Sequence, residues 1–261
     1  MSSELKLYKL NSHERDKNII FHEGPHIYEV HGSSKNYISV TTIIHKFFPE
    51  FDGKKIAKMV FKKNFDKEDS PYYNMQIKDI LKQWDDNKNV ASKMGTAMHK
   101  NFELYFNDIQ FEEDFKTKKE YELFLNFLKD HPNLNPFRTE WEVYDEDIKI
   151  AGSIDMLFLN EDGTLDICDW KRCKEIKKDN KFESGLYPLE DLPNTNYWHY
   201  TIQLNMYKRI LEKNYNVKIR NLYLICIHDA NDNYLRFDLP VLNKEIDLIY
   251  ETRLKLFNNN N

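Results

Sequence analysis

Two carboxylates and one ammonium group, Asp155, Asp169 and Lys171, occur close together in apolar, strand-like sequence. Because alternate side chains of a strand point to the same face, Asp169 and Lys171 are expected to be neighbours. Two carboxylates on one sheet face are costly unless a cation joins them. Mg²⁺ or Mn²⁺ suits such oxygen ligands, and the bound ion can polarise a phosphate and activate water. Lys171 would then orient the attacking water, help to deprotonate it, or offset developing charge.

An Asp-x-Lys sequence is weak evidence when it stands alone. Its commonest meaning is a solvated ion pair at the end of a strand. The surrounding sequence therefore decides the interpretation.

The elements around these residues indicate a mixed α/β fold with an antiparallel meander. Strand patterns cover Arg138 to Tyr144, Ile148 to Leu159 and Thr164 to Lys171, with polar turns between them. Helical spacing predicts helices over Ala91 to Asn107, Thr117 to Lys129 and Thr195 to Asn214, and a final helix through Leu242, Ile246, Ile249 and Leu254. Two further strands are expected at Asn221 to His228 and near Tyr234 to Leu239. The meander would bring Asp155, Asp169 and Lys171 to one end of a sheet.

The N-terminal part predicts short antiparallel strands between Asn18 and Val40, followed by a helix that a hydroxyl group caps near Ser39 and that ends at Pro49. Residues 50–90 are rich in lysine and predict helices without clear bounds. We expect a single domain over residues 1–261. Residues 1–90 would form a hairpin and helical elaboration, residues 91–240 the catalytic core, and residues 241–261 a C-terminal helix and tail.

Composition excludes several classes of protein. The apolar fraction of 41% is typical of a globular chain, and no stretch has the length and apolarity of a membrane span or a signal peptide. We therefore expect an intracellular protein that is not secreted and has no membrane partner.

The three cysteines, Cys168, Cys173 and Cys226, predict reduced thiols. They cannot supply the four thiolates of an iron–sulfur cluster. With a net charge of −5, any nucleic-acid site must use local basic clusters.

A histidine lies on the edge of the helix predicted over Ala91 to Asn107. His99 and Glu103 are four residues apart, beside an apolar stripe that contains Met98 and Phe102. This spacing puts an imidazole and a carboxylate together at the edge of a buried face. A lone histidine in such a place is more often a packed residue than a ligand.

The order of these residues along the chain resembles the RecB-type branch of the PD-(D/E)XK nuclease superfamily. The resemblance consists of Gly95-Thr96-x-x-His99-x-x-x-Glu103, Glu140, Gly152-x-x-Asp155, Asp169-Trp170-Lys171 and Gln203-x-x-x-Tyr207. The segment Tyr37 to Thr42 is similar to one that precedes the core in mitochondrial genome-maintenance exonuclease and related phage and viral exonucleases. The resemblance implies a restriction-endonuclease-like fold, with a mixed central sheet and flanking helices.

The resemblance also implies roles for individual residues. His99, Asp155, Asp169 and the main-chain carbonyl of Trp170 would bind the metal, and the imidazole would shift the preference from Mg²⁺ toward Mn²⁺. Lys171 would be catalytic. Glu103 and Glu140 would support the ligands, with Glu140 also close to the reaction.

Gln203 and Tyr207 share a helix face and would contact the scissile phosphate region or buttress the site. Packing of the helix explains Tyr207 equally well, and His199, one turn earlier, is expected only to pack.

Phosphate contacts require basic or hydroxyl groups near the metal. We expect DNA contacts from Arg172, Lys174, Ser39 and Thr41. A second basic cluster consists of Lys54, Lys55, Lys58, Lys62 and Lys63, and a solvated face is the commoner meaning of such a run. Arg172 departs from the Thr or Ser that often follows Asp-x-Lys, which changes the expected local substrate contact. The chain has no phosphate-binding loop, so cleavage without ATP is expected.

These observations predict a Mg²⁺- or Mn²⁺-dependent deoxyribonuclease, most simply an exonuclease that acts on single-stranded DNA or on recessed ends in replication, repair or recombination. One alternative keeps the chemistry and changes the substrate, to a structure-specific DNA endonuclease or an RNA endonuclease. Another is a catalytically silent DNA-binding module, which would be expected to lack a ligand or the lysine. The oligomeric state stays open.

Overall fold

The computed structural model describes residues 5–112 and 115–258, and in these the chain forms two compact units. The first unit consists of Met1–Pro49 and Met98–Asn261, and the second is Glu50–Ala97. The helices are α1 Lys6–Leu10, α2 Val40–His45, α3 Gly53–Asn64, α4 Ile77–Phe106, α5 Lys118–Asp130, α6 Asn196–Asn214 and α7 Asn243–Asn258. The strands are β1 Ile19–His22, β2 Ile27–Val30, β3 Ile38–Ser39, β4 Pro136–Asp145, β5 Ile150–Leu159, β6 Leu165–Lys171, β7 Ile219–Cys226 and β8 Leu235–Asp238. Two 3₁₀ turns cover Asp16–Asn18 and Phe115–Thr117.

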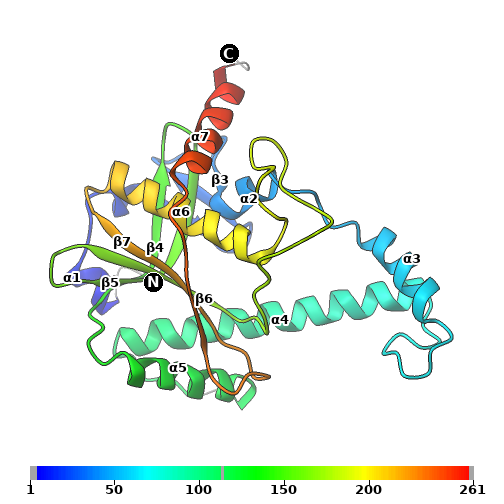
Figure 1. Ribbon diagram of the computed structural model, residues 1–261. Helices are drawn as coiled ribbons and strands as arrows, with labels where there is room; N and C mark the ends of the chain where they lie inside the picture. Colours follow the sequence, from blue (N-terminus) through cyan, green and yellow to red (C-terminus); the bar gives the residue numbers. More distant parts are fainter. Residues whose placement is uncertain (1–4, 113–114, 259–261) are drawn as a thin grey trace. The chain divides into compact units, whose positions relative to one another are not determined.

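The first unit is built on a mixed six-stranded sheet (Figure 1). Strands β4, β5 and β6 pair antiparallel as a meander, β6 and β7 pair in parallel, and β8 returns antiparallel to β7. A parallel pair needs a long crossover, and α6 supplies it between β6 and β7. The predicted mixed α/β fold, with an antiparallel meander and flanking helices, is confirmed.

The strand β5 is the centre of this sheet. It pairs along its length with β4, and its other edge pairs with β3 at Ile150 and Ala151 and with β6 from Met156 to Leu159. Among the residues that the structure describes, those between these two stretches have no strand partner on that edge, so β3 and β6 form a fork around Gly152 to Asp155.

Two hydrophobic clusters cover the two faces of the sheet. Figure 1 shows α5 and α6 on opposite sides of it. On one side, Phe102 from α4 and Phe124 and Phe127 from α5 surround the indole of Trp170. On the other side, α2, α6 and α7 pack on residues such as Leu157 and Leu224. Alternate side chains of each strand therefore pack into two different cores. This arrangement explains the nearly continuous burial of β5 and β6.

The second unit is helical and has a small interior of its own. Ala57 of α3 and Ile80 of α4 are fully buried, and the indole of Trp84 donates a hydrogen bond to the Tyr72 hydroxyl at 3.1 Å. The helix α4 is 30 residues long and starts in this unit. The predicted helix over Ala91 to Asn107 is thus the end of a longer helix, because the preceding polar residues also have no helix breaker.

Other differences from the prediction are local. The strand β3 pairs in parallel with β5, whereas all short N-terminal strands were expected to be antiparallel. The helix α2 begins where predicted, with Ser39 as its cap, but ends at His45 before the buried Phe47 and Phe48. Within the described residues, no helix combines the length and apolarity that a membrane span requires.

Candidate metal centre

Three side chains with metal-binding atoms meet at the fork beside β5. They are His99 from α4, Glu140 from β4 and Asp155 from β5, and one ligand atom of each lies within 4.8 Å of the other two. The Nδ1 atom of His99 is 3.5 Å from Asp155 Oδ2 and 3.6 Å from Glu140 Oε1. These separations are longer than normal hydrogen bonds. The register from Thr139–Met156 to Trp141–Ile154 sets Glu140 opposite Asp155, so two carboxylates lie side by side.

The main chain of Trp170 holds two members of this cluster. Its N–H donates to Asp155 Oδ2 at 2.9 Å, and its carbonyl oxygen is 2.9 Å from His99 Nε2. A carbonyl can only accept, so Nε2 carries the proton of that hydrogen bond. A neutral His99 then has its lone pair on Nδ1, which faces the two carboxylates.

Glu140 has an unusual backbone conformation. Its φ is +43°, in the left-handed region that a residue other than glycine enters at a cost, although it lies within a strand. The hydroxyl of Ser153 donates to Glu140 Oε2 at 2.9 Å and fixes the carboxylate. Strain of this kind persists where the surrounding structure holds it, and here it aims a carboxylate at the cluster.

Asp169 and Lys171 lie next to the cluster on β6. Lys171 Nζ forms an ion pair with Asp169 Oδ2 at 2.7 Å, without the alignment of a hydrogen bond. The same ammonium lies 4.7 Å from the centre of the Tyr200 ring of α6, a cation–π contact. Strand alternation separates these groups from their neighbour Trp170, whose indole points into the opposite core. Lys171 is thus held between a carboxylate and an aromatic face.

Burial and excess negative charge determine the electrostatics of the site. Burial, followed by the charge of Asp155, raises the pKa of Asp169 to about 7. Burial also raises the pKa of Asp155, where Glu140 adds to the rise and His99 and Lys171 oppose it. Burial opposes charge on His99, but Asp155 and then Glu140 raise the pKa of this imidazole to about 9. The carboxylates therefore attract positive charge, which in the protein alone comes from His99 and Lys171.

The donor set fits a divalent cation that prefers oxygen ligands. Octahedral coordination at 2.0–2.1 Å puts neighbouring ligand atoms about 3 Å apart and opposite ones about 4 Å apart. The distances from His99 Nδ1 to the two carboxylates, 3.5 and 3.6 Å, fall between these two values. Two carboxylates and one imidazole are also a set that Mg²⁺ or Mn²⁺ accepts.

The structure distributes the predicted ligands differently from the prediction. His99 and Asp155 meet, and Glu140, expected in support, joins them. Among the described residues, Asp169 does not belong to this group of three but pairs with Lys171, and the Trp170 carbonyl accepts from His99.

Glu103 is also not a member of this group of three among the described residues. Its carboxylate accepts from Lys100 at 2.6 Å, across less than one turn of α4. The exposed Lys100 therefore pairs with the carboxylate that was expected to support a metal ligand.

Arg172 has a structural contact that its sequence position does not indicate. Its Nε donates to Glu120 Oε1 of α5 at 2.7 Å, and both side chains are largely buried. A second contact reaches Asp229 at 3.6 Å. The guanidinium is thus engaged within the protein, whereas Lys174, two residues later, is exposed.

The hydroxyl groups expected to contact DNA lie at the start of α2. Ser39 Oγ accepts from the Thr42 amide at 3.0 Å and is 2.9 Å from Thr41 Oγ1. These contacts are the predicted helix cap. They leave the DNA role of Ser39 and Thr41 as a prediction.

Gln203 and Tyr207 lie on α6, buried against the sheet. Gln203 Nε2 is 3.5 Å from the Tyr207 hydroxyl, at the limit of a hydrogen bond. A Cβ atom at Gly152 of β5 would come within 2.7 Å of the Tyr207 ring, so this glycine permits the close approach of α6 to β5. Tyr207 therefore has a packing role in addition to any contact with substrate.

Three contributors were missed at the level of sequence. Tyr200 contacts Lys171, Ser153 holds Glu140, and Glu120 pairs with Arg172. Tyr200 lies one turn before Gln203 on the same helix face, a signal that could have revealed it. Glu120 is distant in sequence and gave no signal.

Comparisons with known proteins add little to this geometry. No protein-family model matches the chain, and no curated protein matches it. Among solved structures, the chain is similar to SSO0001 at 14% identity and a TM-score of 0.34, over 86% of this chain and 78% of that one. It is also similar to a "putative exonuclease" from Eubacterium rectale at 11% identity and a TM-score of 0.37, over 86% and 80% of the two chains. At these values, neither likeness establishes a family or an activity for this chain.

Proposed function

We propose that this protein is a Mg²⁺- or Mn²⁺-dependent deoxyribonuclease, an exonuclease that acts on single-stranded or recessed DNA ends. One observation carries the proposal. His99, Glu140 and Asp155 direct three ligand atoms into the fork of the sheet, and Lys171 is fixed beside them. If the pair of Asp169 with Lys171 had only a structural role, it would need neither a third carboxylate close by nor the strained backbone of Glu140.

The residues divide the chemistry between them. His99, Glu140 and Asp155 would hold the divalent ion, which when bound polarises the phosphate and makes water more acidic. The Lys171 ammonium would donate to a phosphate oxygen as negative charge grows there, and Asp169 and Tyr200 would keep it in place. Water attacks phosphorus, the bond to the 3′ oxygen breaks, and a proton reaches that oxygen. The products then carry 5′-phosphate and 3′-hydroxyl ends.

A time course on end-labelled linear DNA tests this proposal. Single-stranded and double-stranded substrates are compared in Mg²⁺, in Mn²⁺ and in EDTA, beside circular single-stranded DNA. We expect metal-dependent release of nucleotides from linear DNA and no opening of the circle. An opened circle would replace the exonuclease with an endonuclease, and cleavage of RNA alone would change the substrate.

Variants connect the activity to the site. Lys171→Ala and Asp169→Ala should each lose cleavage, and Lys218→Ala, a matched change at an exposed lysine, should not. Full activity of Lys171→Ala and Asp169→Ala would refute the proposed site. Failure of Mn²⁺ to bind in calorimetric titration would favour a silent DNA-binding module.

A further inference from the structure

The helix α3 carries an unusual concentration of positive charge. Its sequence contains five lysines and no acidic residue in a chain whose net charge is −5. The five are Lys54, Lys55, Lys58, Lys62 and Lys63. All are exposed, and no contact within residues 5–112 and 115–258 gives any of their ammonium groups a carboxylate partner.

These lysines form a regular stripe. Lys54, Lys58 and Lys62 follow one another at intervals of four residues, so their Cα atoms are about 6 Å apart along the helix axis. Lys55 lies beside this stripe, three residues before Lys58. The spacing gives a row of point charges about 12 Å long, or about two turns of the helix.

The other side of α3 is used for packing within the second unit. Ala57 is fully buried, Ile56, Val60 and Phe61 are partly buried, and the rings of Phe61 and Phe65 are 4.9 Å apart. Only Met59 is an exposed large apolar side chain of this helix. A helix that inserts into a lipid surface presents an apolar face outward, so the packed apolar face of α3 disfavours a membrane as partner.

Charge complementarity therefore favours a nucleic-acid backbone. A row of phosphates matches a row of ammonium groups, and neutralising them releases bound counterions, which is the main source of sequence-independent affinity. A surface that binds an acidic protein would more often contain arginines and aromatic residues, which are enriched at protein interfaces.

We propose that the lysine stripe of α3 binds the phosphate backbone of the DNA that the enzyme cleaves. This inference rests on the proposed function, because it takes the nuclease substrate as the ligand. The stripe provides affinity without sequence preference, and the chemistry stays with the residues around Asp155.

The salt dependence of binding tests the stripe directly. Binding of the full chain to a fluorescein-labelled oligothymidylate is measured by anisotropy in EDTA, which prevents cleavage, over about 50 to 200 mM KCl. Each lysine that neutralises a phosphate of a single strand contributes about 0.7 to the slope of log affinity against log salt. The variant K54Q/K58Q/K62Q should therefore lose about 2 from this slope, since three contacts are removed.

Two controls separate contact from folding. K54R/K58R/K62R keeps the charge and should keep the slope. K218Q/K244Q/K255Q removes the same charge from exposed lysines of the first unit and should leave the slope unchanged. Thermal melting of every variant shows whether the second unit is still folded.

Each outcome gives a decision. An unchanged slope for folded K54Q/K58Q/K62Q overturns the inference, as does an equal loss in K218Q/K244Q/K255Q. Binding to phosphatidylglycerol vesicles that depends on the α3 lysines, with DNA binding unaffected, would identify a membrane surface instead. A lysine-dependent slope in a protein that cleaves no DNA would support the stripe and refute the proposed nuclease.

Discussion

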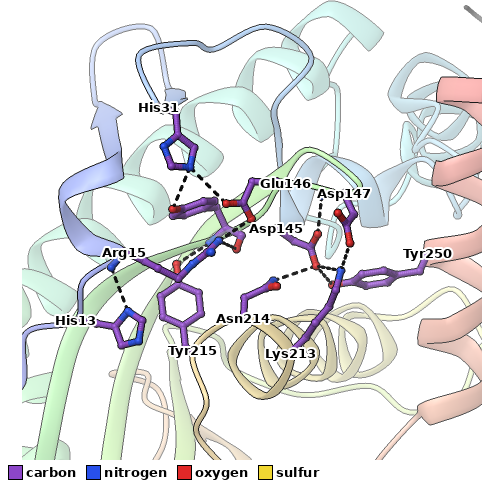
Figure 2. A network of polar contacts seen from close by, with 11 residues as sticks. His13, Arg15, His31, Asp145, Glu146, Asp147, Lys213, Asn214, Tyr215 and Tyr250 are labelled. Carbon is purple, nitrogen blue, oxygen red and sulfur yellow. Dashed lines mark hydrogen bonds and ion pairs between the residues drawn. The ribbon is translucent and has the colours of Figure 1, made fainter.

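Two polar clusters lie on the same pair of strands, and they differ in how their charges are balanced. At the turn between β4 and β5, Asp145 Oδ2 accepts from Lys213, Asn214 and Tyr250, and Asp145 Oδ1 accepts from the Asp147 amide (Figure 2). Near by, Arg15 pairs with Glu146 and lies 4.0 Å from the centre of the Tyr144 ring. Every carboxylate of this cluster has a basic partner from the chain.

The cluster around Asp155 lacks this balance. Glu140, Asp155 and Asp169 share one lysine and one histidine, and burial raises the pKa of both aspartates. The comparison shows that the number of buried acids does not by itself indicate a candidate metal site. What distinguishes it is the carboxylates that the cations of the chain leave unsatisfied.

The largest expected effect is on activity and belongs to the Asp155 cluster. Asp155→Asn should lower single-turnover cleavage about a thousandfold and weaken Mn²⁺ binding, because a charged metal ligand is lost. The melting temperature in EDTA should not fall, since a repulsive charge is removed. A large loss of stability in EDTA would show that the two clusters are of the same kind.

The second effect is on stability and belongs to the Asp145 cluster. Asp145→Ala should lower the free energy of unfolding by about 3 kcal/mol, because a fully buried acceptor of four hydrogen bonds is removed. Urea denaturation measures this loss. Asp147→Ala removes an exposed partner of the same lysine and should cost under about 1 kcal/mol. Near-normal cleavage by folded Asp145→Ala is expected, and a thousandfold loss would contradict the comparison.

The third effect concerns the position of Lys171. Tyr200→Leu should lower kcat roughly tenfold, because the aromatic face beside the ammonium is lost. Tyr200→Phe keeps the ring and should retain activity. KM and Mn²⁺ affinity should stay unchanged in both. Equal losses in the two variants would assign the role to the hydroxyl group rather than to the ring.

The smallest effect is on the pH dependence of stability and concerns His199, which lies outside both clusters. Burial, with a contribution from the charge of His45, lowers the pKa of His199 to about 4. Its Nε2 is 2.9 Å from Asn194 Oδ1, and its ring packs on Phe48. The unfolded chain therefore binds the proton more readily, and stability falls as pH drops from about 6.5 toward 4. Because the ring is partly exposed, we expect about 1 kcal/mol between pH 7 and 5. Urea denaturation should show this loss, and His199→Gln should reduce it. An identical pH dependence in both proteins would contradict the assignment.

Much of the fold followed from patterns in the sequence. Alternation and polar turns predicted β4, β5 and β6, and helical spacing predicted α5 and α6 nearly to their ends. The parallel pairing of β3 was missed because two residues carry no periodic signal. The bounds of α4 were missed because polar residues with good helix propensity do not mark a boundary.

Less of the candidate site could be predicted. The sequence offered His99, Asp155 and Lys171 as candidates by type and order, but their distances depend on where β3 and β6 diverge from β5. The inclusion of Glu140 depends on a left-handed backbone conformation, which no residue type announces. The pairing of Arg172 with Glu120 joins two elements by tertiary packing alone.

The left-handed backbone at Glu140 has a consequence for selection. A glycine there would relieve strain of about 1 to 3 kcal/mol and would also delete a carboxylate from an acid-rich cluster. Selection for thermal stability alone should therefore favour Glu140→Gly, and the variant it enriches should be the inactive one. Retention of glutamate at this position of positive φ would then reflect a trade-off between stability and catalysis.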